Sequence, residues 1–128
     1  MKAGHELPDS AVFDSNILID FLNRRSQART VFEAVTARYV SVVTRSEILV
    51  GIRDERSRLA AEALLAACLM CDVTVSIADR AAAIRQQHRL KLPDALVAAT
   101  ADEFGLPLLT RDEAMTLLPG AVVPYRLQ

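Results

Sequence analysis

The stretch Ala11-Val-Phe-Asp-Ser-Asn-Ile-Leu-Ile19 decides the fold. Ala11–Phe13 is a short apolar run typical of a strand, and the residues from Ser15 to about Asn23 continue in the pattern of a helix. Asp14 stands at the junction between the two. An acid at this place is either the N-cap of the helix or a functional group at the carboxyl end of a strand.

Strands and helices keep alternating outward from this stretch. Further strands are expected at Tyr39–Val43, Val73–Ile77, Pro107–Thr110 and Ala121–Pro124. Helices are expected at Gln27–Thr36, Arg45–Arg53, Ser57–Cys71, Asp79–His88, from Pro93 to just before Gly105, and at Asp112–Leu118. This alternation predicts an α/β fold with a mainly parallel sheet of about four to five strands flanked by helices. It does not predict the order of the strands.

Length and composition favour one domain spanning residues 1–128. A chain of 128 residues with 52% hydrophobic residues has enough apolar side chains for a core. It contains no uncharged apolar run of the roughly 18 residues that a membrane helix needs. We therefore expect a soluble, cytoplasmic protein that makes no contact with a membrane. The net charge of −1 is not that of a strongly basic nucleic-acid binder, although 13 of the 15 basic residues are Arg.

Four acids occupy junctions of this pattern: Asp14, Glu47, Asp94 and Asp112. Each has a purely structural alternative, as a helix cap, as part of a capping box, or as a charge that opposes a helix dipole. As a set they favour a site, because ligands of open α/β sheets bind at the carboxyl ends of the strands. No strand precedes Asp94 in the pattern, so its place depends on the fold and not on local sequence.

Carboxylates brought together repel one another, and a divalent cation relieves that repulsion. Mg²⁺ prefers oxygen ligands. The only other metal-binding residue types, Cys68, Cys71, His5 and His88, lack the spacing of a zinc site. The sequence therefore predicts Mg²⁺ as the cofactor, with Mn²⁺ as a substitute.

At these acids the sequence resembles the PIN-domain family, and within it the VapC-type toxins of VapBC toxin–antitoxin pairs. The resemblance rests on Asp14-Ser-Asn16, on Glu47 after the second strand, on Leu92-Pro-Asp-Ala95, and on Thr110-Arg-Asp112. All four occur in family order between Val12 and about Val123. The first acid lies deeper in the chain than in many such toxins, so residues 1–10 are expected to form a flexible N-terminal tail.

The resemblance implies a magnesium-dependent endoribonuclease, a phosphodiester hydrolase, that acts as the toxin of a type II pair. It also implies a homodimer that is neutralised by a VapB-like antitoxin. A face of the helix expected at Ser57–Cys71 is the predicted dimer contact; the other reading places that face in the monomer's own core. The alternative function is a PIN-like module that binds RNA or protein without nuclease activity.

The resemblance also assigns roles to residues. Asp14 and Asp94 are the best direct metal ligands; Glu47 ligates the metal or positions its water, and Asp112 serves a second ion. Ser15, Asn16 and Thr110 are expected to hydrogen-bond the carboxylates, or else to cap helices and turns. Arg45 and Arg111 lie beside the acids and either contact phosphate or form structural ion pairs.

Two other acid-based folds are excluded by residues. A haloacid-dehalogenase-type phosphatase needs a second Asp two residues after the first, and this position is Asn16. A receiver domain needs a Lys after a later strand, and the chain's two lysines are Lys2 and Lys91.

Overall fold

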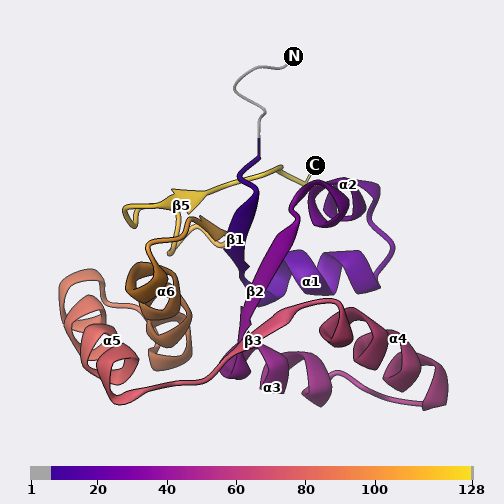
Figure 1. Ribbon diagram of the computed structural model, residues 1–128, viewed down its shortest axis with the longest axis horizontal. Coiled ribbons are helices and arrows are strands. Elements are labelled where there is room, and N and C mark those ends of the chain that lie inside the picture. The colour runs from indigo at the N-terminus through magenta and orange to yellow at the C-terminus, as the bar shows by residue number, and fades with distance from the viewer. Residues whose placement is uncertain (1–6, 128) are drawn as a thin grey trace.

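The computed structural model, which describes residues 7–127, has one sheet of five parallel strands in the order β3-β2-β1-β4-β5. The strands are β1 (Ser10–Phe13), β2 (Ala37–Ser41), β3 (Leu69–Cys71), β4 (Leu108–Leu109) and β5 (Ala121–Val122). The helices are α1 (Ser15–Leu22), α2 (Ser26–Ala34), α3 (Val42–Val50), α4 (Glu55–Ala66), α5 (Val75–His88) and α6 (Leu92–Phe104). Helices α1 to α4 lie on one side of the sheet and α5 and α6 on the other, as Figure 1 shows. This confirms the predicted α/β fold.

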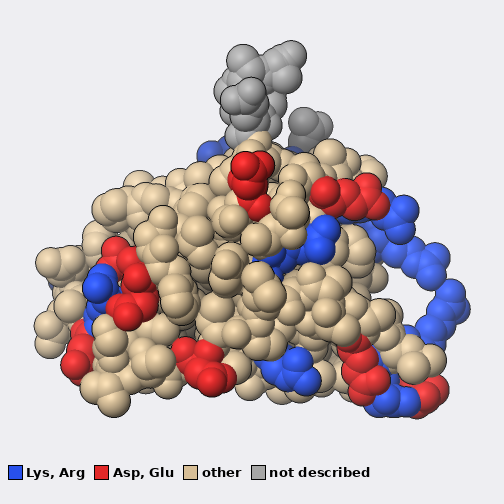
Figure 2. Space-filling model, viewed as in Figure 1, with Lys and Arg blue, Asp and Glu red and all other residues tan. Residues whose placement is uncertain are grey.

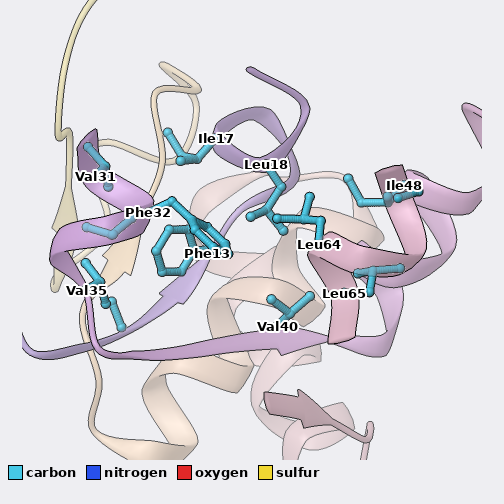
Figure 3. Close-up of a cluster of buried hydrophobic side chains, with 13 residues drawn as sticks. Phe13, Ile17, Leu18, Val31, Phe32, Val35, Val40, Ile48, Leu64 and Leu65 are labelled. Carbon is cyan, nitrogen blue, oxygen red and sulfur yellow. The ribbon is translucent and has the colours of Figure 1, made fainter. Parts of the chain in front are cut away.

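Alternation along the strands creates two cores. In β1, Phe13 belongs to the cluster under α1 to α4, whereas Val12 belongs to the cluster under α5 and α6. Successive side chains of a strand point to opposite faces, so one short strand serves both layers. Phe13 meets Phe32 of α2 edge-on, with ring centroids 6.0 Å apart, inside the cluster drawn in Figure 3. The buried strand β1 thus fixes the position of the residue that follows it, Asp14.

The prediction of a strand at Val73–Ile77 is wrong, because α5 begins at Val75. Thr74 is instead the N-cap of α5, because its side-chain oxygen accepts a hydrogen bond from the backbone N–H of Ile77 at 3.2 Å. The third strand is formed earlier, by β3, which pairs with β2. For the same reason the expected helix Ser57–Cys71 is too long at its carboxyl end: α4 stops at Ala66, and Cys71 lies in the sheet.

Two further boundaries differ from expectation. The second strand ends at Ser41 instead of Val43, since the Ser41 side chain accepts from Val43 N–H and starts α3. The stretch 112–118 is a series of turns and not a helix. Its backbone bonds join residues three apart, such as Met115 N–H to Asp112 O at 2.9 Å, and Pro119 follows at once. The other expected elements are present, with ends shifted by a few residues.

The ends of the chain bear on two expectations. Of the expected tail over residues 1–10, residues 1–6 lie outside the described part, Leu7 packs against the first core, and Ser10 begins β1. Within residues 7–127, no helix has both the length and the apolar character needed to cross a membrane.

Candidate active site

The pairing of β1 with β4 places two site residues side by side. The strands are parallel neighbours, with Phe13 opposite Leu109, so both end at the same edge of the sheet. The backbone N–H of Asp14 continues the ladder and donates to Leu109 O at 2.9 Å. Asp14 and Thr110, the first residues beyond the two strands, therefore adjoin although 96 positions separate them.

The Asp14 carboxylate is buried, with 3% of the residue exposed, and hydrogen bonds hold both its oxygens. Oδ1 accepts from the backbone N–H of Ser15 at 2.8 Å. Oδ2 accepts from the Thr110 hydroxyl at 2.7 Å and from Nδ2 of Asn16 at 3.3 Å. Asn16 and Thr110 thus contact the carboxylate through their side chains, as expected, whereas the contact of Ser15 is made by its backbone.

Thr110 also joins Asp112 to this group. Its hydroxyl oxygen accepts from the Asp112 backbone N–H at 3.1 Å while the hydroxyl donates to Asp14. The half-buried Asp112 side chain accepts from Ala114 N–H at 2.9 Å, an arrangement that closes a turn. One buried hydroxyl consequently links two of the four predicted acids.

Asp94 reaches the same end of the sheet from α6. Pro93 stands in the first turn of this helix, where its missing N–H costs no hydrogen bond, and the half-buried Asp94 follows it. Burial raises the pKa of Asp94 above its ordinary value, the charge of Asp112 raises it further, and Lys91 opposes the shift. The chain thus brings Asp94 within electrostatic reach of Asp112, which no local pattern around residue 94 predicts.

Among these acids, the pKa of Asp14 is raised the most. Burial raises the pKa of its carboxyl to about 6, against the lowering effect of the hydrogen bonds from Thr110 and Ser15. The charges of Asp94 and Asp112 add to the rise. Like charges held together in a poorly hydrated place disfavour ionisation, and a bound cation would relieve that cost. The structure therefore brings three of the four predicted acids into one electrostatic group.

The structure does not join Glu47 or Arg45 to this group. Both side chains are exposed on α3, and no hydrogen bond or ion pair connects either of them to another residue of the described chain. Their assigned roles stay predictions.

Arg111 binds Asp20, a residue that the sequence analysis missed. Its Nε and one terminal nitrogen donate to the two oxygens of Asp20 at 2.6 and 2.8 Å. The described geometry is that of the structural ion pair, the alternative to a phosphate contact. The signal for Asp20 was a single acid in the otherwise apolar end of the α1 segment, Ile-Leu-Ile-Asp-Phe-Leu.

Whether these residues fit a metal depends on their chemistry and their spacing. Among residues 7–127, no three His, Cys, Asp or Glu side chains lie close enough to hold one ion together. The donors are all carboxylate oxygens, however, and their mutual repulsion suits a hard cation. One turn before Glu47, the fully buried hydroxyl of Thr44 has no hydrogen-bond partner within the described residues. Buried polar groups nearly always have a partner, so this hydroxyl is hydrogen-bonding capacity that the chain itself leaves unused.

Fold and site together define a parallel α/β domain with an acid-lined edge at the carboxyl ends of its strands. Residues 11–120 match the PIN domain. The chain therefore belongs to the PIN-domain family, as its four motifs predicted.

Solved structures agree with this assignment. The protein is similar to a chain of a toxin–antitoxin complex from Klebsiella pneumoniae, with a TM-score of 0.86 and 36% identity over 92% of this chain and 100% of that one. It shares its fold with VapBC2 from Rickettsia felis (TM-score 0.77, 14% identity, 91% and 96% of the chains). It also shares its fold with VapBC-5 from Mycobacterium tuberculosis (TM-score 0.64, 22% identity, 89% and 94%). No curated protein matches this chain.

Proposed function

We propose that this protein is a divalent-metal-dependent endoribonuclease that acts as the toxin of a type II toxin–antitoxin pair. The observation that carries the proposal is the coupled group of Asp14, Asp94 and Asp112 at the carboxyl end of the sheet, where burial and mutual repulsion raise the pKa of Asp14 to about 6. Carboxylates arranged at such cost to their own ionisation are typical of functional sites.

Asp14 and Asp94 are the proposed direct ligands of Mg²⁺ or Mn²⁺. Glu47 is proposed to ligate the metal or position its water, and Asp112 to serve a second ion. Bound there, the metal would supply a water of lowered pKa and neutralise charge on the phosphodiester. Thr110, Asn16 and the Ser15 N–H hold the Asp14 carboxylate in one orientation through the bonds described above. Such fixed carboxylates let the site act without reorganisation when the substrate arrives.

RNA is the proposed substrate, and a VapB-like antitoxin the proposed partner. The K. pneumoniae structure, 36% identical to this chain, is a toxin–antitoxin complex, which supports the partner. Figure 2 shows basic side chains along the edge of the molecule formed by α2 and α4. Arg24 and Arg25 precede α2 and Arg29 lies within it. Guanidinium groups attract a phosphate backbone, so this edge favours a nucleic acid as the substrate.

The decisive experiment is cleavage of total RNA in Mg²⁺ or in EDTA by the wild type, Asp14→Asn and Asp94→Asn. We expect cleavage by the wild type in Mg²⁺ only, and none by either variant, because an amide keeps the shape of the carboxylate and loses its charge. Asp79→Asn, the same change on the exposed face of α5, is the matched control and should cleave normally. Metal-dependent cleavage by both site variants would refute the site.

A second function, a binding module without nuclease activity, is favoured by one observation. The described chain does not gather three potential ligands around a single point. If the wild type binds RNA or an antitoxin but cleaves no RNA at any Mg²⁺ or Mn²⁺ concentration, the binding module replaces the nuclease.

A further inference from the structure

Asp20 is a buried acid outside the predicted site. It lies in α1 with 2% of the residue exposed, and both of its oxygens are occupied. Arg111 donates two hydrogen bonds to it, the Tyr125 hydroxyl donates a third at 2.7 Å, and Arg25 Nε lies 3.6 Å away. Burial by itself would raise the pKa of Asp20, but the bonds from Arg111 and Tyr125 outweigh it and hold the pKa below its ordinary value.

This cluster is directly connected to the candidate site. Arg111 stands between Thr110, which bonds Asp14, and Asp112. The backbone N–H of Arg111 donates to Oδ1 of Asn16 at 3.3 Å, and Nδ2 of the same amide contacts Asp14. Thr110 is bonded through its hydroxyl to Asp14 and through its backbone N–H to Val122 O at 3.1 Å. The next residue, Arg111, is held by its backbone on Asn16 and by its side chain on Asp20.

We propose that Asp20 is a positioning residue of the active site: through Arg111 it fixes the segment that carries Thr110 and Asp112. The inference rests on the proposed function. A bidentate Arg–carboxylate pair constrains both distance and orientation, which a single hydrogen bond does not. Thr110 is still bonded to β5, but residues 112–118 form turns without a regular helix, so the backbone beyond Arg111 gives Asp112 little rigidity of its own. The Tyr125 hydroxyl also donates to Asp20, so the C-terminal part of the chain is bonded to the same carboxylate as Arg111.

The competing role for Arg111 is a phosphate contact, and the two roles predict opposite kinetics for Asp20→Asn. If Arg111 binds phosphate, loss of the Asp20 charge frees its guanidinium, and the KM for RNA falls. If Asp20 positions the segment, kcat falls about 10- to 100-fold, because small misplacements of catalytic groups are costly, and KM stays within about two-fold.

The test pairs these kinetics with a readout that needs no RNA and no metal. Hydrogen exchange of the Arg111 and Asp112 amides is measured in EDTA for the wild type and Asp20→Asn. We expect exchange at these two amides to accelerate at least about ten-fold, while the Asp14 amide, bonded to Leu109 in the sheet ladder, changes little. Leu65→Ala, in the core under α4, is the control for general destabilisation, and it should leave kcat unchanged at a temperature where it is folded.

Unchanged exchange at residues 111 and 112, or a fall in KM with kcat retained, overturns the inference while the nuclease proposal stands. If the wild type itself cleaves no RNA, the proposed function fails, and the exchange measurement still decides whether Asp20 holds the segment. Should Asp20→Asn not fold, Tyr125→Phe takes its place. It removes one hydrogen bond from Asp20 and keeps the Arg111 pair, and we expect a smaller acceleration at the same two amides; none would overturn the inference.

Discussion

We expect the buried carboxylate of Asp14 to destabilise the protein at neutral pH when no divalent metal is added, because burial raises its pKa. Its folded pKa of about 6, against an ordinary 3.8, makes ionised Asp14 cost up to about 3 kcal/mol. Asp14→Asn removes that cost and loses part of the hydrogen bonding, worth about 1 kcal/mol. We therefore expect the variant to be more stable than the wild type by about 1–2 kcal/mol at pH 7.5, in urea unfolding with EDTA.

The pH dependence gives the sign of the effect. Because the folded pKa is raised, the contribution of Asp14 to wild-type stability is present below about pH 3.8 and is lost as pH rises through about 6. The advantage of Asp14→Asn should shrink by about 2 kcal/mol between pH 7.5 and pH 4.5. A variant less stable than the wild type at every pH would mean that the carboxylate is structural.

Thr44 combines complete burial with an unbonded hydroxyl, and this makes Thr44→Val informative. Val has the same shape without the polar group, so we expect a stability gain of about 1 kcal/mol.

Thr100 is the matched control for Thr44. It is equally buried, but its hydroxyl donates to Leu96 O at 2.8 Å. Thr100→Val should lose stability by about 1 kcal/mol, because it gives up a hydrogen bond. If both Val variants lose stability, the Thr44 hydroxyl has a hydrogen-bond partner in the folded protein and is not left unsatisfied.

Among the helices, α5 depends on the residue that caps its N-terminus, Thr74. The Thr74 side chain caps the helix by accepting from Ile77 N–H. Thr74→Ala should lower the free energy of unfolding by about 1 kcal/mol, and Tm by about 3–5 °C. Thr74→Ser keeps the acceptor and should remain near the wild type in the same thermal melts; equal losses in both variants would exclude the cap as the cause.

The same residue explains how far the sequence predicts the elements. Val73–Ile77 is rich in β-branched residues, so period and composition favour a strand, yet a single cap at Thr74 turns the segment into a helix. In β1 no such competition exists, and the strand Ala11–Phe13 with Asp14 at its end was predicted correctly. The local sequence pattern predicts an element correctly where strand propensity and the capping residues indicate the same boundary. It fails where a side chain inside a β-branched run caps a helix instead.

At the scale of the whole folded chain, the candidate site depends on contacts between residues that are far apart in the sequence. Asp14 and the Thr110 segment meet because β4 pairs beside β1, and α6 carries Asp94 to the same edge. The sequence motifs identified these residues as candidates, but their proximity follows from the strand order β3-β2-β1-β4-β5, which the sequence did not predict. The pair of Asp20 with Arg111 spans 91 positions and has no motif, so the sequence could not predict it.

The whole molecule is expected to self-associate as a homodimer. We expect light scattering at micromolar concentration to give twice the chain mass of 14.0 kDa. The structure weakens the predicted contact through α4, since Ala61, Leu64 and Leu65 face the monomer's core and Leu59 alone is a large exposed apolar residue of this helix. Leu69 on the edge strand β3 and Val75 at the start of α5 are also at least half exposed, which leaves apolar surface for a second copy. We therefore expect Leu59→Glu to remain a dimer. A monomeric Leu59→Glu would restore α4 as the contact, whereas a monomeric wild type would remove the homodimer altogether.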